Sequence, residues 1–219
     1  MAYANRGYSK DSLEDFKGAI EDFNKAIELK PSFPEAHNNL GNALTSLGKN
    51  EQAIKSFRKA IELKPNYFEA YFNLGNTLKG MKQHEEAINS YNKVIEFQPD
   101  YAEAHNNLGN ALNELGNSAE AIASYNKAIE FKPDYAEAYN NLGNTLNELG
   151  QHAEAIDSYN KAIELKPDFT QAYDNLGNIL NILGQHQEAI RSYNKIIELK
   201  PEYAEAYFHL ANLLLANSA

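Results

Sequence analysis

The sequence contains no cysteine, so disulfide bonds and thiolate metal sites are excluded. Long apolar runs are also missing, because no stretch reaches the ~18 apolar residues that a membrane-spanning helix needs. The segment Met1–Lys10 has neither the basic region nor the apolar region of a signal peptide. We therefore expect a cytoplasmic protein with no membrane partner.

Basic residues are scarce. The chain has 20 Lys and Arg against 30 Asp and Glu, a formal net charge of −10. Binding to a phosphate backbone needs clustered Lys and Arg, so nucleic acid is not an expected partner. An acidic surface instead favours neutral or basic segments of a protein partner. The hydrophobic content of 43% is ordinary for a folded protein.

Proline recurs at a fixed interval of 34 residues. It stands at Pro31, Pro65, Pro99, Pro133, Pro167 and Pro201. A constant period in this range is typical of a tandem repeat array, in which each unit is too small to bury its own apolar face and stacks on its neighbours. Such arrays present extended surfaces rather than closed catalytic pockets.

One repeat, residues 100–133, predicts two helices. Asp100 followed by Glu103 has the spacing of a capping box and predicts the first helix start. Gly116 predicts a left-handed stop, and Pro133 ends the unit. Apolar residues follow helical spacing in both halves. Helices of about 13 residues are marginal alone, so stacking must stabilise them.

Two columns of small residues predict close contact between the helices of each repeat. Glycine inside a helix is unfavourable by roughly 0.5–1 kcal/mol relative to alanine, so its recurrence needs a packing reason. The columns are Gly41, Gly75, Gly109, Gly143 and Gly177, and Ala53, Ala87, Ala121, Ala155 and Ala189.

The recurring positions of one repeat carry a family resemblance. They are Tyr139, Leu142, Gly143, Leu146, Ala155, Tyr159, Ala162 and Pro167. This pattern resembles the tetratricopeptide repeat. The resemblance implies an all-α fold, a right-handed superhelical solenoid of antiparallel helix pairs. It assigns residues 1–219 to a single array with repeats 1–33, 34–67, 68–101, 102–135, 136–169 and 170–203 and a terminal helix 204–217.

Asparagines form a polar stripe on the first helix of each repeat, opposite its apolar face. In the family these helices line the concave surface, so the resemblance implies an asparagine ladder in a groove. A side-chain amide has both donors and an acceptor and can pair with an extended peptide backbone. The first set is Asn39, Asn73, Asn107, Asn141 and Asn175, and the second set is Asn42, Asn76, Asn110, Asn144 and Asn178.

A structural role is the alternative for both sets, because these asparagines can bond to the backbone of the neighbouring repeat. That alternative is favoured for the second set. A more variable column beside the ladder offers candidates for selectivity, of which we select Phe72 and Asp174; packing between repeats is the alternative role of Phe72. The column is Asn38, Phe72, Asn106, Asn140, Asp174 and Phe208.

We predict a scaffold that binds an extended peptide or partner segment in its groove. The ladder also resembles the repeat arms of O-linked N-acetylglucosamine transferases, so one alternative is the substrate-targeting arm of a larger transferase. Another is a scaffold that associates end to end through its last helix, where Leu210, Leu213, Leu214 and Leu215 cluster. The six histidines have no metal-binding spacing and no catalytic constellation is visible, so we expect neither enzyme activity nor a cofactor.

Overall fold

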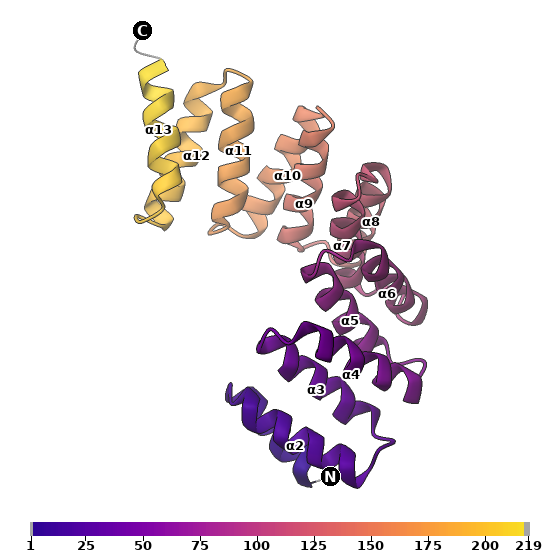
Figure 1. Ribbon diagram of the computed structural model, residues 1–219. Coiled ribbons are helices and arrows are strands. Elements are labelled where there is room, and N and C mark those ends of the chain that lie inside the picture. Colours follow the sequence, from indigo (N-terminus) through magenta and orange to yellow (C-terminus); the bar gives the residue numbers. More distant parts are fainter. Residues whose placement is uncertain (1, 217–219) are drawn as a thin grey trace. The chain divides into compact units, whose positions relative to one another are not determined.

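The computed structural model describes residues 2–216, which contain helices and no strands. The chain divides into two compact units, Met1–Leu115 and Gly116–Ala219. Each unit consists of helices joined by short turns, and Figure 1 shows how consecutive helices run back and forth within each unit.

The described part of unit 1, residues 2–115, contains seven helices. α1 packs on α2, α3 on α4 and α5 on α6, and each second helix also packs on the next first helix. The first helices touch one another as well, in the pairs α1–α3, α3–α5 and α5–α7. Their bounds are α1 Ala2–Ser12, α2 Phe16–Leu29, α3 Pro34–Ser46, α4 Asn50–Leu63, α5 Phe68–Gly80, α6 His84–Phe97 and α7 Ala102–Glu114.

In unit 2, residues 116–216 are described and form six helices with the same arrangement. α9 packs on α10, α11 packs on α12, and each second helix again contacts the next first helix. The first helices α9 and α11 are also in contact. Their bounds are α8 Ser118–Phe131, α9 Ala136–Glu148, α10 His152–Leu165, α11 Thr170–Ile182, α12 His186–Leu199 and α13 Ala204–Ala216.

These helices confirm the predicted all-α architecture of antiparallel helix pairs. The two helices of the second repeat, α3 and α4, have 13 and 14 residues, close to the expected length. The terminal helix begins at Ala204 as predicted, and the last residue assigned to it, Asn217, lies outside the described residues. The right-handed superhelix and the single continuous array stay predictions.

The turn between the two helices of a repeat requires a left-handed residue. Gly116 has φ of +78°, so the predicted stop is confirmed. Five other turns place a residue with positive φ at the same position, and two of these residues are not glycine. They are Glu14 (61°), Gly48 (70°), Lys82 (60°), Gly150 (74°) and Gly184 (73°).

The capping-box prediction is wrong. Helix α7 begins at Ala102 behind Tyr101, and no side chain caps it. The Tyr101 N–H donates to the Gln98 carbonyl oxygen at 3.2 Å, which places Asp100 inside a turn before the helix. Glu103 instead lies in the first turn, where the helix dipole favours a negative charge.

The glycine column makes room for an aromatic ring from the second helix. A Cβ atom on Gly75 would lie 2.7 Å from Cε1 of Tyr91, a side chain that is completely buried. The same relation holds between Gly41 and Phe57, where the distance would be 2.5 Å. The predicted close contact is therefore confirmed, and the ring explains why glycine is needed.

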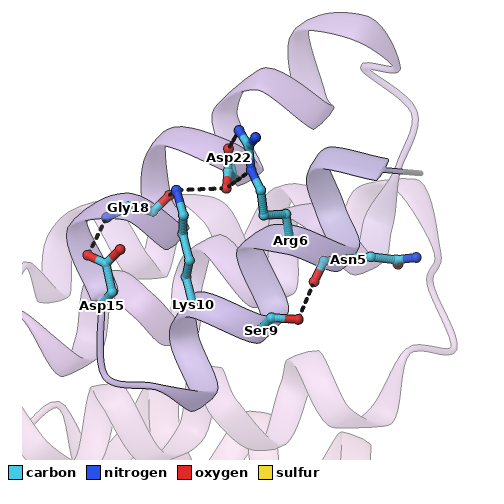
Figure 2. A network of polar contacts seen from close by, with 7 residues as sticks. All are labelled: Asn5, Arg6, Ser9, Lys10, Asp15, Gly18 and Asp22. Atoms are coloured by element: carbon cyan, nitrogen blue, oxygen red, sulfur yellow. Dashed lines mark hydrogen bonds and ion pairs between the residues drawn. The ribbon is translucent and has the colours of Figure 1, made fainter.

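The first repeat replaces buried leucines with a charged cluster. Figure 2 shows Arg6 and Lys10 of α1 converging on Asp22 of α2. Arg6 Nε donates to Asp22 Oδ2 at 2.8 Å, and Lys10 Nζ lies 3.0 Å from the same oxygen. The corresponding residues of the second repeat, Leu40 and Leu44, are buried. Asp22 itself is buried, so its two cations are what make burial of the carboxylate favourable.

Candidate functional site

All ten ladder asparagines are partly exposed on the first helices. We call the surface that they form the amide face. In unit 1 it comprises the ladder asparagines of α3, α5 and α7, and in unit 2 those of α9 and α11. The fold thus presents these amides at the surface of each unit, as the helical spacing predicts.

The amides of unit 1 also connect neighbouring repeats. Asn73 Nδ2 donates to Asn38 Oδ1 at 3.1 Å, which links α5 to α3. Asn107 Nδ2 donates to Asn76 Oδ1 at 3.0 Å, which links α7 to α5. The Asn107 oxygen in turn accepts from Lys79 Nζ at 3.1 Å. The amide face of unit 1 is therefore a network of side chains rather than a row of independent groups.

The same spacing recurs in unit 2. Asn175 Nδ2 on α11 donates to the side-chain oxygens of two residues on α9, Asn140 at 3.0 Å and Asn144 at 2.8 Å. Asn110 and Asn141 also interact with other residues. The four asparagine–asparagine bonds described between repeats thus have sequence separations of 35 or 31 residues.

A tyrosine from the second helix holds most of the second asparagine set. Three hydroxyls donate to an asparagine oxygen 15 residues earlier, each at 2.9 Å: Tyr91 to Asn76, Tyr159 to Asn144 and Tyr193 to Asn178. Burial raises the pKa of each of these tyrosines, to about 12 for Tyr193. The phenols are therefore protonated at neutral pH and act as donors.

Members of both asparagine sets, such as Asn73 and Asn76, thus take part in side-chain hydrogen bonds between helices. An amide has two N–H donors and an oxygen with two lone pairs. The bonds between repeats use only part of that capacity. Partly exposed amides such as Asn73 and Asn76 can therefore hold the repeats together and still bond to a ligand.

Phe72 packs on aromatic rings of its own predicted repeat, 68–101, and its packing between repeats stays a prediction. Its ring centroid lies 5.0 Å from that of Tyr101 and 6.1 Å from that of Tyr91. Phe72 is partly exposed, so the same ring also reaches the surface. In the same column, the side chains of Asn38 and Asn140 are buried.

Asp174 is the acidic member of this column and is partly buried. Its Oδ2 accepts from Asn178 Nδ2 at 3.2 Å, whereas its Oδ1 is buried without a hydrogen-bond partner. Burial raises the pKa of Asp174, although the charge of His209 and the Asn178 bond lower it in part. Asp174 therefore contributes a poorly solvated carboxylate beside the amide face of unit 2.

A pocket of about 280 Å³ opens on the amide face of unit 1, between α3, α4 and α5. Its lining contains amides, hydroxyls and one aromatic ring and no charged side chain. Two of the hydroxyls, Thr45 Oγ1 and Thr77 Oγ1, lie 3.3 Å apart. The lining residues are Asn42, Thr45, Ser46, Phe57, Asn73, Asn76 and Thr77.

Sequence reasoning missed this pocket and the role of Phe57, although a signal was present. Phe57 occupies a column that holds tyrosine in all later repeats, so it lacks the hydroxyl that its equivalents use. The column is Phe23, Phe57, Tyr91, Tyr125, Tyr159 and Tyr193.

Residues 2–216 hold no candidate metal site. In this part of the chain no three His, Cys, Asp or Glu side chains gather as a metal ion would require. None of the helices described has the length and apolar character of a membrane span.

Family models identify the repeat unit. The model described as TPR repeat matches residues 12–45, 41–82, 81–116, 109–150 and 177–218, and two models described as tetratricopeptide repeat match 136–169 and 158–191. The chain belongs to the tetratricopeptide-repeat family. This agrees with the paired helices, the glycine–aromatic contacts and the turn residues of both units of this tetratricopeptide-repeat protein.

Solved structures of tetratricopeptide-repeat proteins are similar to it. MamA is 30% identical, with a TM-score of 0.69 over 76% of this chain and 97% of that chain. YrrB, described as a TPR protein with an unusual peptide-binding site, is 25% identical, with a TM-score of 0.67 over 86% of this chain and 97% of that chain. PilF of Pseudomonas aeruginosa is 18% identical with a TM-score of 0.81 over 96% of each chain, and shows the fold alone. The comparison with curated proteins gave no match.

Proposed function

We propose that this protein is a protein-interaction module whose amide face binds an extended peptide or an extended segment of a partner. The observation that carries the proposal is the row of partly exposed asparagine amides on successive first helices. The proposal includes all ten ladder asparagines, with Phe72 and Asp174 beside them as selectivity residues. In this arrangement the groove that the family resemblance implies is the site of binding.

The chemistry of the amide face suits a peptide backbone. An extended chain offers a carbonyl oxygen and an N–H group at intervals of about 3.3 Å per residue. Asparagines three residues apart on one helix, such as Asn39 and Asn42, are neighbours about 5–6 Å apart on its surface. Several amides can therefore bond to one chain without requiring a particular sequence.

Charge favours neutral or basic segments. The net charge is −10, and exposed glutamates in the first turns of α3 and α5, Glu35 and Glu69, lie on the first helices. The similar protein YrrB, described as having an unusual peptide-binding site, supports a peptide as the ligand.

The experiment is selection of random linear peptides on the purified protein, followed by mapping of the binding face. A selected peptide carrying a photo-crosslinking group is irradiated with the protein, and the linked residues are identified by mass spectrometry. We expect links to α3, α5, α7, α9 or α11. Links confined to the outward surfaces of α4, α6, α10 and α12, or a library that yields no binder, would refute the proposal.

A second candidate function, association of copies through α13, is favoured by apolar exposure at this helix. Phe208 is 64% exposed, Leu214 50% and Leu215 70%, whereas the equivalent of Leu214 in the preceding repeat, Leu180, is 6% exposed. Exposed apolar surface of this kind marks interaction sites. Sedimentation velocity over a range of concentrations should show oligomers that Leu214→Glu abolishes. A monomer at every concentration would exclude this candidate.

A further inference from the structure

Asn42 differs from the other ladder asparagines. Of the ten ladder asparagines, all of which lie within the described residues 2–216, Asn42 is the one whose side chain takes part in no hydrogen bond, although it is only partly exposed. Two of its equivalents in later repeats, Asn76 and Asn144, are each held by two donors, a tyrosine hydroxyl 15 residues later and an asparagine amide 31 residues later. A third, Asn178, accepts from the hydroxyl of Tyr193.

The first donor is missing because residue 57 is phenylalanine. The ring itself is in its usual place, since Phe57 contacts Gly41 as Tyr91 contacts Gly75. A hydroxyl on this ring would occupy the position equivalent to the Tyr91 hydroxyl, which donates to Asn76, and could donate to Asn42 in the same way. The oxygen of Asn42 therefore lacks its first donor because one atom is missing, although the ring is packed as in the next repeat.

The second donor is directed elsewhere. Asn73, 31 residues after Asn42, gives its Nδ2 group to Asn38 instead. The neighbouring ladder residue Asn39 accepts from Asn38 Nδ2 at 3.3 Å, and its own Nδ2 group donates to no residue in the described chain. The first repeat supplies no acceptor for it, because Ala4 and Tyr8 stand where the second repeat has Asn38 and Asn42.

The open amide of Asn42 lines the 280 Å³ pocket of unit 1. Small-molecule sites usually enclose about 300–1,000 Å³, so this pocket is of a size for one side chain of a longer ligand. Its lining is uncharged, and a buried charge without a partner is strongly unfavourable. The pocket therefore suits an uncharged side chain.

We propose that this pocket is the anchoring point of the bound peptide, which deepens the proposed function and rests on it. Asn42 binds one backbone unit of the extended chain: its Nδ2 group donates to a peptide carbonyl oxygen, and its Oδ1 accepts from a peptide N–H. The uncharged side chain beside that unit enters the pocket next to Phe57. The other ladder amides, already bonded between repeats, add weaker contacts along the chain.

Two substitutions test this assignment through the same amide. Asn42→Ala removes the amide, and Phe57→Tyr adds the hydroxyl that occupies Oδ1 in other repeats. Two net hydrogen bonds of about 0.5–1.5 kcal/mol each correspond to roughly 5-fold to 150-fold in affinity, so Asn42→Ala should raise the dissociation constant about tenfold or more. Phe57→Tyr, which blocks only the oxygen, should raise it about threefold to fivefold.

The control is Asn92→Ala. Asn92 is an exposed asparagine on α6, away from the amide face, so its substitution should not weaken binding. The probe is a peptide selected from the random linear library on the wild-type protein, and its affinity for each variant is measured by fluorescence anisotropy.

The outcomes separate this inference from the proposed function. A library that yields no binder refutes the proposed function. In another outcome, a peptide crosslinks to the first helices and yet binds wild type, Asn42→Ala and Phe57→Tyr with equal affinity. That result would refute Asn42 as the anchor, and the proposal that the amide face binds the peptide would still hold. Loss of folding would not explain weaker binding, because neither variant should melt below wild type. Asn42 makes no internal bond and alanine is the better helix former, and Phe57→Tyr should melt slightly above wild type because it adds a bond equivalent to the one that Tyr91 makes to Asn76.

Discussion

Gly75→Ala tests the contact that sets the distance between the two helices of a repeat. The added Cβ would lie 2.7 Å from Tyr91 Cε1, and ordinary contact begins at 3.4 Å, so the ring would have to retreat by about 0.7 Å. Tyr91 is completely buried and its hydroxyl is bonded to Asn76, so it has little room to move.

The expected loss follows from three effects. Overpacking costs about 1–3 kcal/mol, a strained or lost Tyr91 hydrogen bond about 1 kcal/mol, and the better helix propensity of alanine returns about 0.5–1 kcal/mol. We expect the free energy of unfolding to fall by about 2 kcal/mol, which lowers the Tm by roughly 4–8 °C.

The matched control is Gly80→Ala in the same helix. Gly80 has negative φ and no heavy atom within 4 Å of an added Cβ, so only helix propensity acts and stability should rise by up to about 0.5 kcal/mol. Both variants are compared with wild type by circular dichroism during thermal and urea unfolding. A Gly75→Ala protein as stable as Gly80→Ala would refute the packing explanation for the glycine column.

Three further predictions concern stability. Lys82 has φ of +60°, and left-handed conformations cost most residues roughly 1–2 kcal/mol. Lys82→Gly should therefore raise the free energy of unfolding by about 1 kcal/mol. A urea unfolding curve that shows no gain in stability would contradict this. Hydrogen bonding to Arg6 lowers the pKa of Asp22 from 3.8 to about 2, so wild type should lose stability as pH falls from about 4 to about 2. Since Arg6 is 59% exposed, solvent screening limits this loss to about 1 kcal/mol; Asp22→Asn, melted at each pH, should lack that part of the pH dependence. Tyr159→Phe removes a 2.9 Å hydrogen bond to Asn144 and should cost about 1 kcal/mol, and an unchanged melting curve would show that this bond contributes nothing.

The repeat period makes the helices predictable from the sequence. A 34-residue interval between prolines and a left-handed glycine such as Gly116 fix where helices end. The capping-box prediction failed because the pair Asp100 and Glu103 has the right spacing, but Asp100 lies one residue before Tyr101, the N-cap of α7. Local spacing cannot reveal that Tyr101 bonds back to Gln98 and occupies the capping position itself.

The position of the ladder was predictable, but its hydrogen bonds were not. Helical periodicity places Asn73 and Asn76 on one surface, whereas the choice of partner depends on distances between repeats. Asn73 bonds to Asn38, and Asn76 accepts from Tyr91. The missing hydroxyl at Phe57 was visible in the sequence, yet its meaning depends on knowing that tyrosine at this column holds an asparagine.

The measurement that tests the central claim most directly is a nuclear magnetic resonance titration of the asparagine side-chain amides. The protein is labelled with nitrogen-15 and a selected peptide is added. The account predicts that the amide signals of Asn39, Asn42 and Asn73 shift with the peptide while those of the exposed α6 asparagines Asn89 and Asn92 stay unchanged. Shifts of Asn89 and Asn92 without any change on α3 and α5 would contradict it.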